Sequence, residues 1–150
     1  MTTSRAQDLP SRSLSLEQNT YLGYRILQCL FVVAPILAGL DKFFHVLTNW
    51  NQYLAPQVAS LVNGRVSEFM MVVGIIEIVA GVGVALKPKY FAFVVMAWLL
   101  GIIINLLSFH AYLDIALRDL GLAAAAFVLG RLALHYDTGN LGGLIRHHPL

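Results

Sequence analysis

Eight polar side chains that lie within or beside apolar segments are the residues of this sequence that could carry chemistry. They are Asp41, Lys42, His45, Glu77, Asn105, His110, Arg118 and Asp119. Ionisable groups at membrane depth are costly unless they pair with one another or with a ligand, and they commonly mark functional sites. We therefore interpret these eight residues as a candidate ligand-binding site or buried polar network.

Glu77 is the most informative of the eight because it lies near the middle of its apolar segment. A carboxyl group at that depth must be neutral, paired with a cation such as Lys42 or Arg118, or in contact with a polar ligand. Gly74 and Gly81 lie on either side of it, where small residues let a neighbouring helix approach closely.

The remaining charges are expected to pair across helices. Asp41, Lys42 and His45 are spaced three and four residues apart, so they can share one broad helix face. A network of Asp41 and Lys42 with Arg118 and Asp119 would neutralise all four charges.

Metal, haem and thiol chemistry are not expected. No HxxxH or ExxH spacing fixes two ligands on one helix, and no histidine pair is placed to hold a haem across helices. Cys29 is the only cysteine, so no intramolecular dithiol can form. We assign no catalytic residue and no metal ligand, and we do not expect a stand-alone enzyme.

The composition points to the lipid bilayer. Of the 150 residues, 58% are hydrophobic and only 12% are charged, which departs from ordinary soluble domains in both respects. The net charge is +2, but the basic residues are scattered between apolar runs and form no patch. Nucleic acid is therefore excluded as a partner.

Four segments are long enough to cross about 30 Å of hydrocarbon at about 1.5 Å per residue. The sequence thus predicts an all-α, antiparallel bundle of four transmembrane helices. The spans are Tyr24 to Val46, Val66 to Leu86, Tyr90 to Phe109 and Tyr112 to Leu134. The second and third are separated by little more than the turn KPK, whose proline stops the helix, so they form a hairpin.

The fourth span needs its charged residues. The strictly apolar stretch from Leu120 to Gly130 has eleven residues, which as helix cover only about 17 Å. The span must therefore include Arg118 and Asp119, which we expect to face protein rather than lipid.

The distribution of lysine and arginine predicts the orientation, with most of them on the side that carries both chain ends. We expect a multi-pass protein of the bacterial inner membrane with cytoplasmic termini. Residues 1–21 are predicted to be a disordered lead, residues 22–134 the membrane domain, and residues 135–150 a short cytoplasmic tail.

The longest connection, from Thr48 to Arg65, carries Trp50 and Tyr53. It is expected either to lie along the membrane surface with a short helix over QVASLV, or to be a plain loop. Polar groups enter the outer half of every span and are rare in the inner half. This asymmetry predicts a polar pocket, open to the outside, above an apolar floor.

Three short motifs resemble the DoxX-like family of small four-helix membrane proteins. They are a G-x-x-K at Gly39 to Lys42, an E-x-x-x-G at Glu77 to Gly81, and the basic-acidic pair Arg118 and Asp119. The resemblance covers about Tyr24 to Leu134. It implies an accessory subunit of a membrane oxidoreductase or oxidative-stress system, with a quinone as candidate ligand and oxidoreductase subunits, or further copies of the chain, as partners.

Two other functions are compatible with the same residues. A small-solute or proton transporter would use Glu77 as a group that titrates midway through the bilayer. A structural scaffold without ligand would use the charges only to fix the register of the helices.

Overall fold

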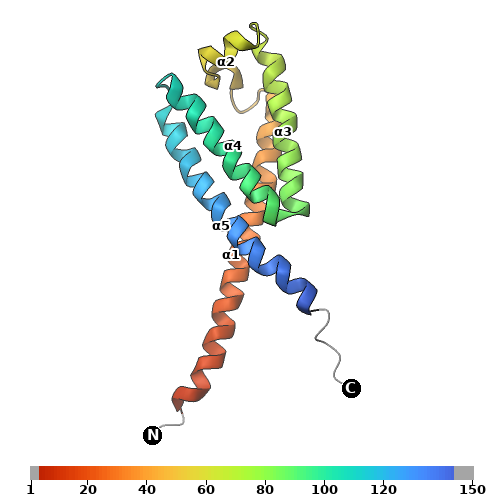
Figure 1. Ribbon diagram of the computed structural model, residues 1–150, viewed down its shortest axis with the longest axis vertical. Coiled ribbons are helices and arrows are strands. Elements are labelled where there is room, and N and C mark those ends of the chain that lie inside the picture. The colour runs from red at the N-terminus through yellow and green to blue at the C-terminus, as the bar shows by residue number, and fades with distance from the viewer. Residues whose placement is uncertain (1–3, 144–150) are drawn as a thin grey trace.

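The computed structural model describes the backbone of residues 4–143 and the side chains of residues 14–136. All regular secondary structure in this part of the chain is helical and no strand is present, as predicted (Figure 1). In chain order the elements are α1 (Ser4–Phe44), the 3-10 helix η1 (Trp50–Tyr53), α2 (Pro56–Leu61), α3 (Val66–Leu86), α4 (Pro88–Ser108) and α5 (Leu113–Gly143).

Three segments are long and apolar enough to cross a membrane: Leu14–Phe44 of α1, all of α3 and all of α4. Their outward faces carry large apolar side chains, such as Ile75 and Ile104, which are 53% and 70% exposed. Side chains of this kind are stable against lipid, whereas an apolar surface of this extent would be unfavourable in water. The prediction of an all-helical fold is confirmed, and three of its helices have the length and composition that a membrane span requires.

Local sequence explains where the helices end. Pro88 is the first residue of α4, and the fixed geometry of proline suits that position while preventing α3 from continuing. The single residue Lys87 separates the two helices, which confirms the predicted hairpin. α3 has the predicted bounds, and the short helix expected over QVASLV forms as α2.

The first and last helices are longer than the predicted spans. α1 begins at Ser4, within residues 1–21, for which a disordered lead is predicted, and α5 continues past Leu134 to Gly143. Aromatic contacts hold the two helices together here: the ring centroids of Tyr21 and Tyr24 lie 5.2 and 5.3 Å from that of Tyr136. Residues 144–150 of the expected tail lie outside the described part.

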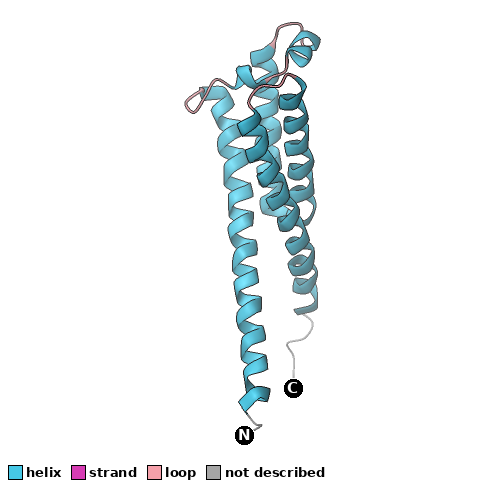
Figure 2. Cartoon of the chain, turned by 90° about the vertical axis from the view of Figure 1, so that its left-hand side faces the viewer, coloured by secondary structure: helices cyan, strands magenta, loops and turns pink. Residues whose placement is uncertain are grey.

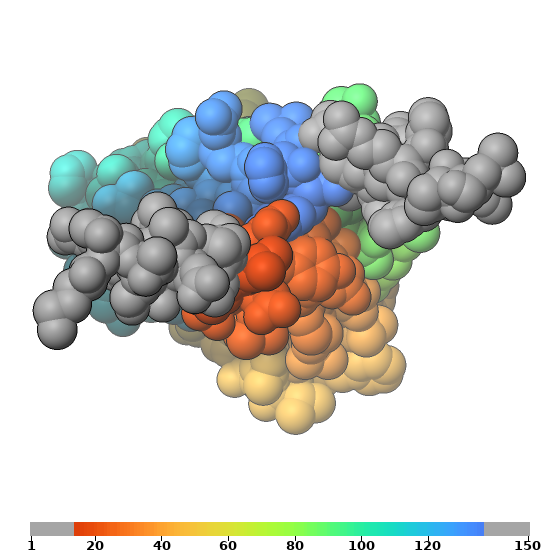
Figure 3. Space-filling view, turned by 90° about the horizontal axis from the view of Figure 1, so that it is seen from below, coloured from red at the N-terminus to blue at the C-terminus, as the bar shows by residue number. Residues whose placement is uncertain are grey.

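The long helices form two packed pairs, α1 with α3 and α4 with α5. The pairs converge near the α3–α4 turn and spread apart toward the end where η1 and α2 lie (Figure 1). Beyond that turn α1 and α5 continue toward the chain termini, at the opposite end of the molecule from η1 and α2 (Figure 2). Seen from the terminal end, α1 and α5 lie side by side (Figure 3). The main apolar core is the layer where the pairs converge, and its members include Phe31, Val84, Val95 and Leu129.

Glycine allows α1 and α3 to touch backbone to backbone. A Cβ atom added to Gly39 would lie 2.5 Å from the Gly74 carbonyl oxygen, and one added to Gly74 would lie 2.6 Å from the Gly39 carbonyl oxygen. A Cβ atom on Gly81 would meet the Val32 carbonyl oxygen at 2.8 Å. The close approach that Gly74 and Gly81 predicted is thus present.

We predict that Gly74→Ala destabilises the protein by about 1–3 kcal/mol, because the added methyl group must push two helix backbones apart. Gly121→Ala is the matched control, since a Cβ atom there meets nothing within 4 Å. Thermal unfolding in detergent measures both variants, and equal melting temperatures would show that the α1–α3 contact is not tight.

Candidate ligand-binding site

A buried ion pair joins the first helix pair. Lys42 Nζ of α1 lies 2.6 Å from Glu77 Oε2 of α3, and the two side chains are 3% and 12% exposed. Among the three states that the sequence left open for Glu77, the structure shows pairing with Lys42. Removing either partner would destabilise the protein, because the remaining charge would be buried without compensation.

Antiparallel packing explains why two residues at different heights can meet. Gly39 faces Gly74, so Lys42 lies one turn beyond this contact in one direction and Glu77 one turn beyond it in the other. The two Cα atoms are therefore separated by roughly 9 Å along the helix axes. Helical side chains tilt toward the N-terminus of their own helix, so in antiparallel helices these two side chains extend toward each other.

Asp41 does not join a network with Arg118 and Asp119, contrary to the sequence-based expectation. One of its carboxylate oxygens accepts hydrogen bonds from the backbone N–H groups of Val46 and Leu47, at 2.8 and 2.9 Å. The other accepts a 2.7 Å hydrogen bond from the indole nitrogen of Trp50. Asp41 therefore fixes the chain where it leaves α1, because its carboxylate accepts from three N–H donors that follow it by five to nine residues.

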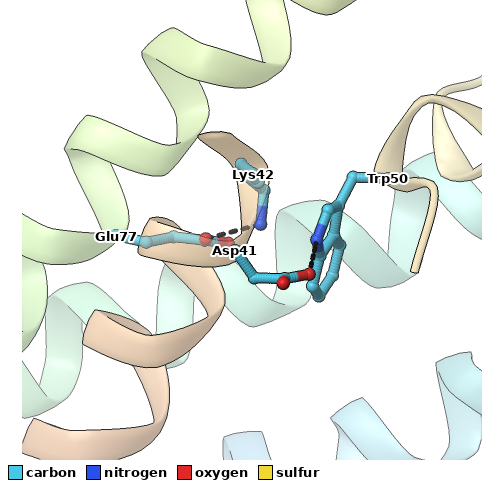
Figure 4. A network of polar contacts seen from close by, with 4 residues as sticks. All are labelled: Asp41, Lys42, Trp50 and Glu77. Atoms are coloured by element: carbon cyan, nitrogen blue, oxygen red, sulfur yellow. Dashed lines mark hydrogen bonds and ion pairs between the residues drawn. The ribbon is translucent and has the colours of Figure 1, made fainter. Parts of the chain in front are cut away.

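Trp50 connects Asp41 to the ion pair. Its indole nitrogen donates to Asp41, and the centroid of its ring lies 3.8 Å from Lys42 Nζ, in cation–π geometry. Figure 4 shows the four residues, with the hydrogen bond between Asp41 and Trp50 and the ion pair between Lys42 and Glu77 as dashed lines. The cation–π contact of Lys42 with Trp50 links these two interactions. The end of α1, the following loop and α3 are thus held to one another.

Arg118 and Asp119 pair with each other. Arg118 Nε and Nη2 both lie 3.0 Å from Asp119 Oδ1. The Asp119 side chain is 5% exposed, whereas that of Arg118 is 63% exposed. The expected four-charge network is therefore replaced by two separate ion pairs, since Lys42 is engaged by Glu77 and Arg118 reaches its own neighbour.

The segment from Thr48 to Arg65, which we call the lid, is fastened to α4 by Asn105. The Asn105 amide nitrogen donates to the Tyr53 carbonyl oxygen at 2.7 Å, and its amide oxygen accepts from the Ala55 N–H at 3.0 Å. The ring of Tyr53 packs edge-on against that of Tyr112, with centroids 4.8 Å apart. The lid thus spans from the first helix pair to the second.

A cavity of about 540 Å³ lies beneath the lid, between the two helix pairs. Its volume and its largely apolar walls are typical of small-molecule sites. The polar and charged residues that line it from the long helices are Lys42, Glu77, Asn105, Arg118 and Asp119. Five of the eight candidate site residues are therefore brought to one cavity, and Asp41 lies directly behind Trp50.

His45 and His110 lie elsewhere. Each is exposed and has a positive φ, 54° and 52°, just after the end of α1 and of α4. The His45 N–H donates to the Asp41 carbonyl oxygen, as is usual for a residue that ends a helix in the left-handed conformation. Neither histidine lines the cavity.

Sequence reasoning missed both tryptophans as site residues. Trp50 and Trp98 line the cavity, and Trp98 Nε1 is buried beside Glu77 without a hydrogen bond of ordinary geometry. A signal was present for Trp98, because it lies seven residues, about two helical turns, before Asn105 and therefore on the same face of α4.

Comparison with models of protein families, with curated proteins and with solved structures finds no match to this chain. Function is therefore inferred from the cavity and from the residues that line it.

We predict that Lys42→Met costs about 3–5 kcal/mol of stability, because it leaves Glu77 buried without a cation. The double variant Lys42→Met with Glu77→Leu should recover most of that loss. The control is Arg65→Met, which breaks the exposed 3.7 Å pair with Glu68 and should cost less than about 1 kcal/mol. Chemical unfolding measures the series, and a double variant no more stable than Lys42→Met would contradict the pairing.

We predict that Asn105→Leu loosens the lid, because the Tyr53 carbonyl and the Ala55 N–H lose their partner. Hydrogen exchange followed by mass spectrometry should show faster exchange across residues 53–58 and little change in α3. Gln57→Leu, at an exposed position of α2, is the control. Unchanged exchange in Asn105→Leu would mean that other contacts hold the lid.

Proposed function

We propose that this chain is a multi-pass protein of the bacterial inner membrane whose cavity binds a small molecule with an apolar body and a polar head. The proposal includes α5 as a fourth span and places both termini in the cytoplasm. The resemblance to the DoxX-like family implies that this ligand is a quinone and that the protein is an accessory subunit of a membrane oxidoreductase.

Length and charge pairing support the crossing of α5. Its stretch from Leu113 to Leu134 would cover about 33 Å as helix, which exceeds the hydrocarbon thickness. The charges of Arg118 and Asp119 compensate each other at 3.0 Å, and Asp119 is buried against protein. An even number of spans also agrees with termini at one end (Figure 1).

Basic residues support the orientation. Arg25, Lys87, Lys89 and Arg131 lie toward the end that holds the termini, whereas fewer basic residues lie toward the lid. Cytoplasmic ends of membrane proteins are enriched in lysine and arginine. The lid and the cavity would then face the outer side of the membrane.

The observation that carries the binding function is the cavity. It has the volume of a small-molecule site, and its polar groups gather around Lys42 and Glu77. Parts of all three motifs on which the family resemblance depends also meet there: Lys42 with Glu77 and, on the opposite wall, Arg118 with Asp119. This convergence supports a common function for residues that are far apart in sequence.

Native mass spectrometry with lipid and quinone analysis tests the proposal. We expect the protein, extracted in mild detergent, to retain about one small neutral molecule per chain. Glu77→Gln, which leaves Lys42 without its counter-charge, should retain it several-fold less. The matched control is Glu68→Gln, in the first turn of α3 and exposed, which should behave as wild type.

Two results would contradict the proposal. An empty wild-type protein would favour a ligand-free scaffold or a transporter, and equal occupancy in Glu77→Gln and wild type would remove the role given to Glu77. Co-purification of an oxidoreductase subunit would support the accessory role.

A further inference from the structure

The end of the cavity that lies beneath the lid is closed by several independent fastenings. Asn105 holds the lid backbone at two points, Asp41 holds Trp50 and the backbone before it, and Asn51 Nδ2 donates to Ser67 Oγ at 2.9 Å. Entry from the aqueous side would require most of these contacts to break together.

The sides of the cavity are open instead. Some of the residues that line it are also exposed on the outer surface, away from the helix ends, and they are small or apolar: Leu30 and Ala34 of α1, and Ala97 and Gly101 of α4. They lie along the gaps between the helix pairs, because α1 contacts α5, and α3 contacts α4, far less than each contacts its own partner. A Cβ atom added to Gly101 would meet nothing within 4 Å.

The charged side chains that line the cavity carry no net charge together. Its walls carry two cations and two anions, arranged as the pairs Lys42 with Glu77 and Arg118 with Asp119. A charged ligand would add a net charge in a region of low dielectric constant, where uncompensated charge is costly. A neutral molecule with a hydrogen-bonding head would not disturb either pair.

We infer that the cavity takes a neutral molecule dissolved in the bilayer, which enters sideways between the two helix pairs while the lid stays closed. This inference rests on the proposed binding function and narrows its ligand class. It excludes charged, water-soluble molecules as the normal occupants.

The chain offers an internal reporter for this route. Its two tryptophans, Trp50 and Trp98, both line the cavity, so intrinsic fluorescence reports on quenchers that enter it. The protein would be reconstituted in phosphatidylcholine vesicles. The probes are a nitroxide-labelled nonane, which partitions into the bilayer, and iodide, which stays in water.

A pair of glycine variants separates the cavity from the outer surface. Gly101→Phe fills the cavity from α4, whereas Gly121→Phe places the same side chain in open space on α5, at a residue that does not line the cavity. The difference in quenching between these two variants belongs to the cavity. Gly101→Leu serves the same purpose if the phenylalanine variant does not fold.

We expect quenching by the nitroxide to be at least threefold weaker in Gly101→Phe than in Gly121→Phe, and iodide quenching to be equal in the two. A difference found with iodide and not with the nitroxide would overturn the inference in favour of aqueous entry. Equal nitroxide quenching in the two variants would also overturn it.

A second titration distinguishes this inference from the proposed function. Decyl-ubiquinone, which is neutral and lipid-soluble, should quench the tryptophans of wild type saturably, whereas a water-soluble sulfonated anthraquinone should not. Lateral nitroxide access without saturable quinone quenching would refute the quinone and leave the route standing. Saturable quenching by the sulfonated compound would overturn the ligand class inferred here.

Discussion

The ion pair between Lys42 and Glu77 is the interaction on which the arrangement around the cavity depends. It is buried, it joins α1 to α3, and Trp50 of the lid packs on its cation. In a low-dielectric region neither charge is stable alone, so the register of the two helices and the position of the lid are coupled through one contact. The glycine contact between Gly39 and Gly74 makes this register available, because any larger residue would separate the helices before the side chains could meet.

The two helix pairs are held together differently at their two ends. The layer around Phe31, Val84 and Leu129 holds the two helix pairs together near the α3–α4 turn. At the other end the pairs are joined mainly through the lid and Asn105. The cavity therefore lies between the pairs. Polar groups gather on one part of its lining, and apolar side chains form the rest. An arrangement of this kind suits a ligand that is mostly apolar and has one polar end.

Much of the fold could be predicted from sequence because the controlling signals are local. Hydrophobic length predicted the three helices that are apolar enough to cross a membrane, and Pro88 predicted the hairpin between α3 and α4. The partners of Asp41 and Asn105 could not be predicted, because they are backbone groups and Trp50, whose positions depend on how the lid folds back. The histidines were misleading for a related reason: helical spacing placed His45 on a face with Lys42, but the helix ends one residue before it.

A structure of the protein in lipid nanodiscs, determined by electron cryomicroscopy at a resolution that shows side chains, tests the central claim most directly. We expect Lys42 and Glu77 in contact, with non-protein density of a small elongated molecule in the cavity between them and Asn105. A structure in which the two helix pairs close on each other and side chains fill this space would contradict the account.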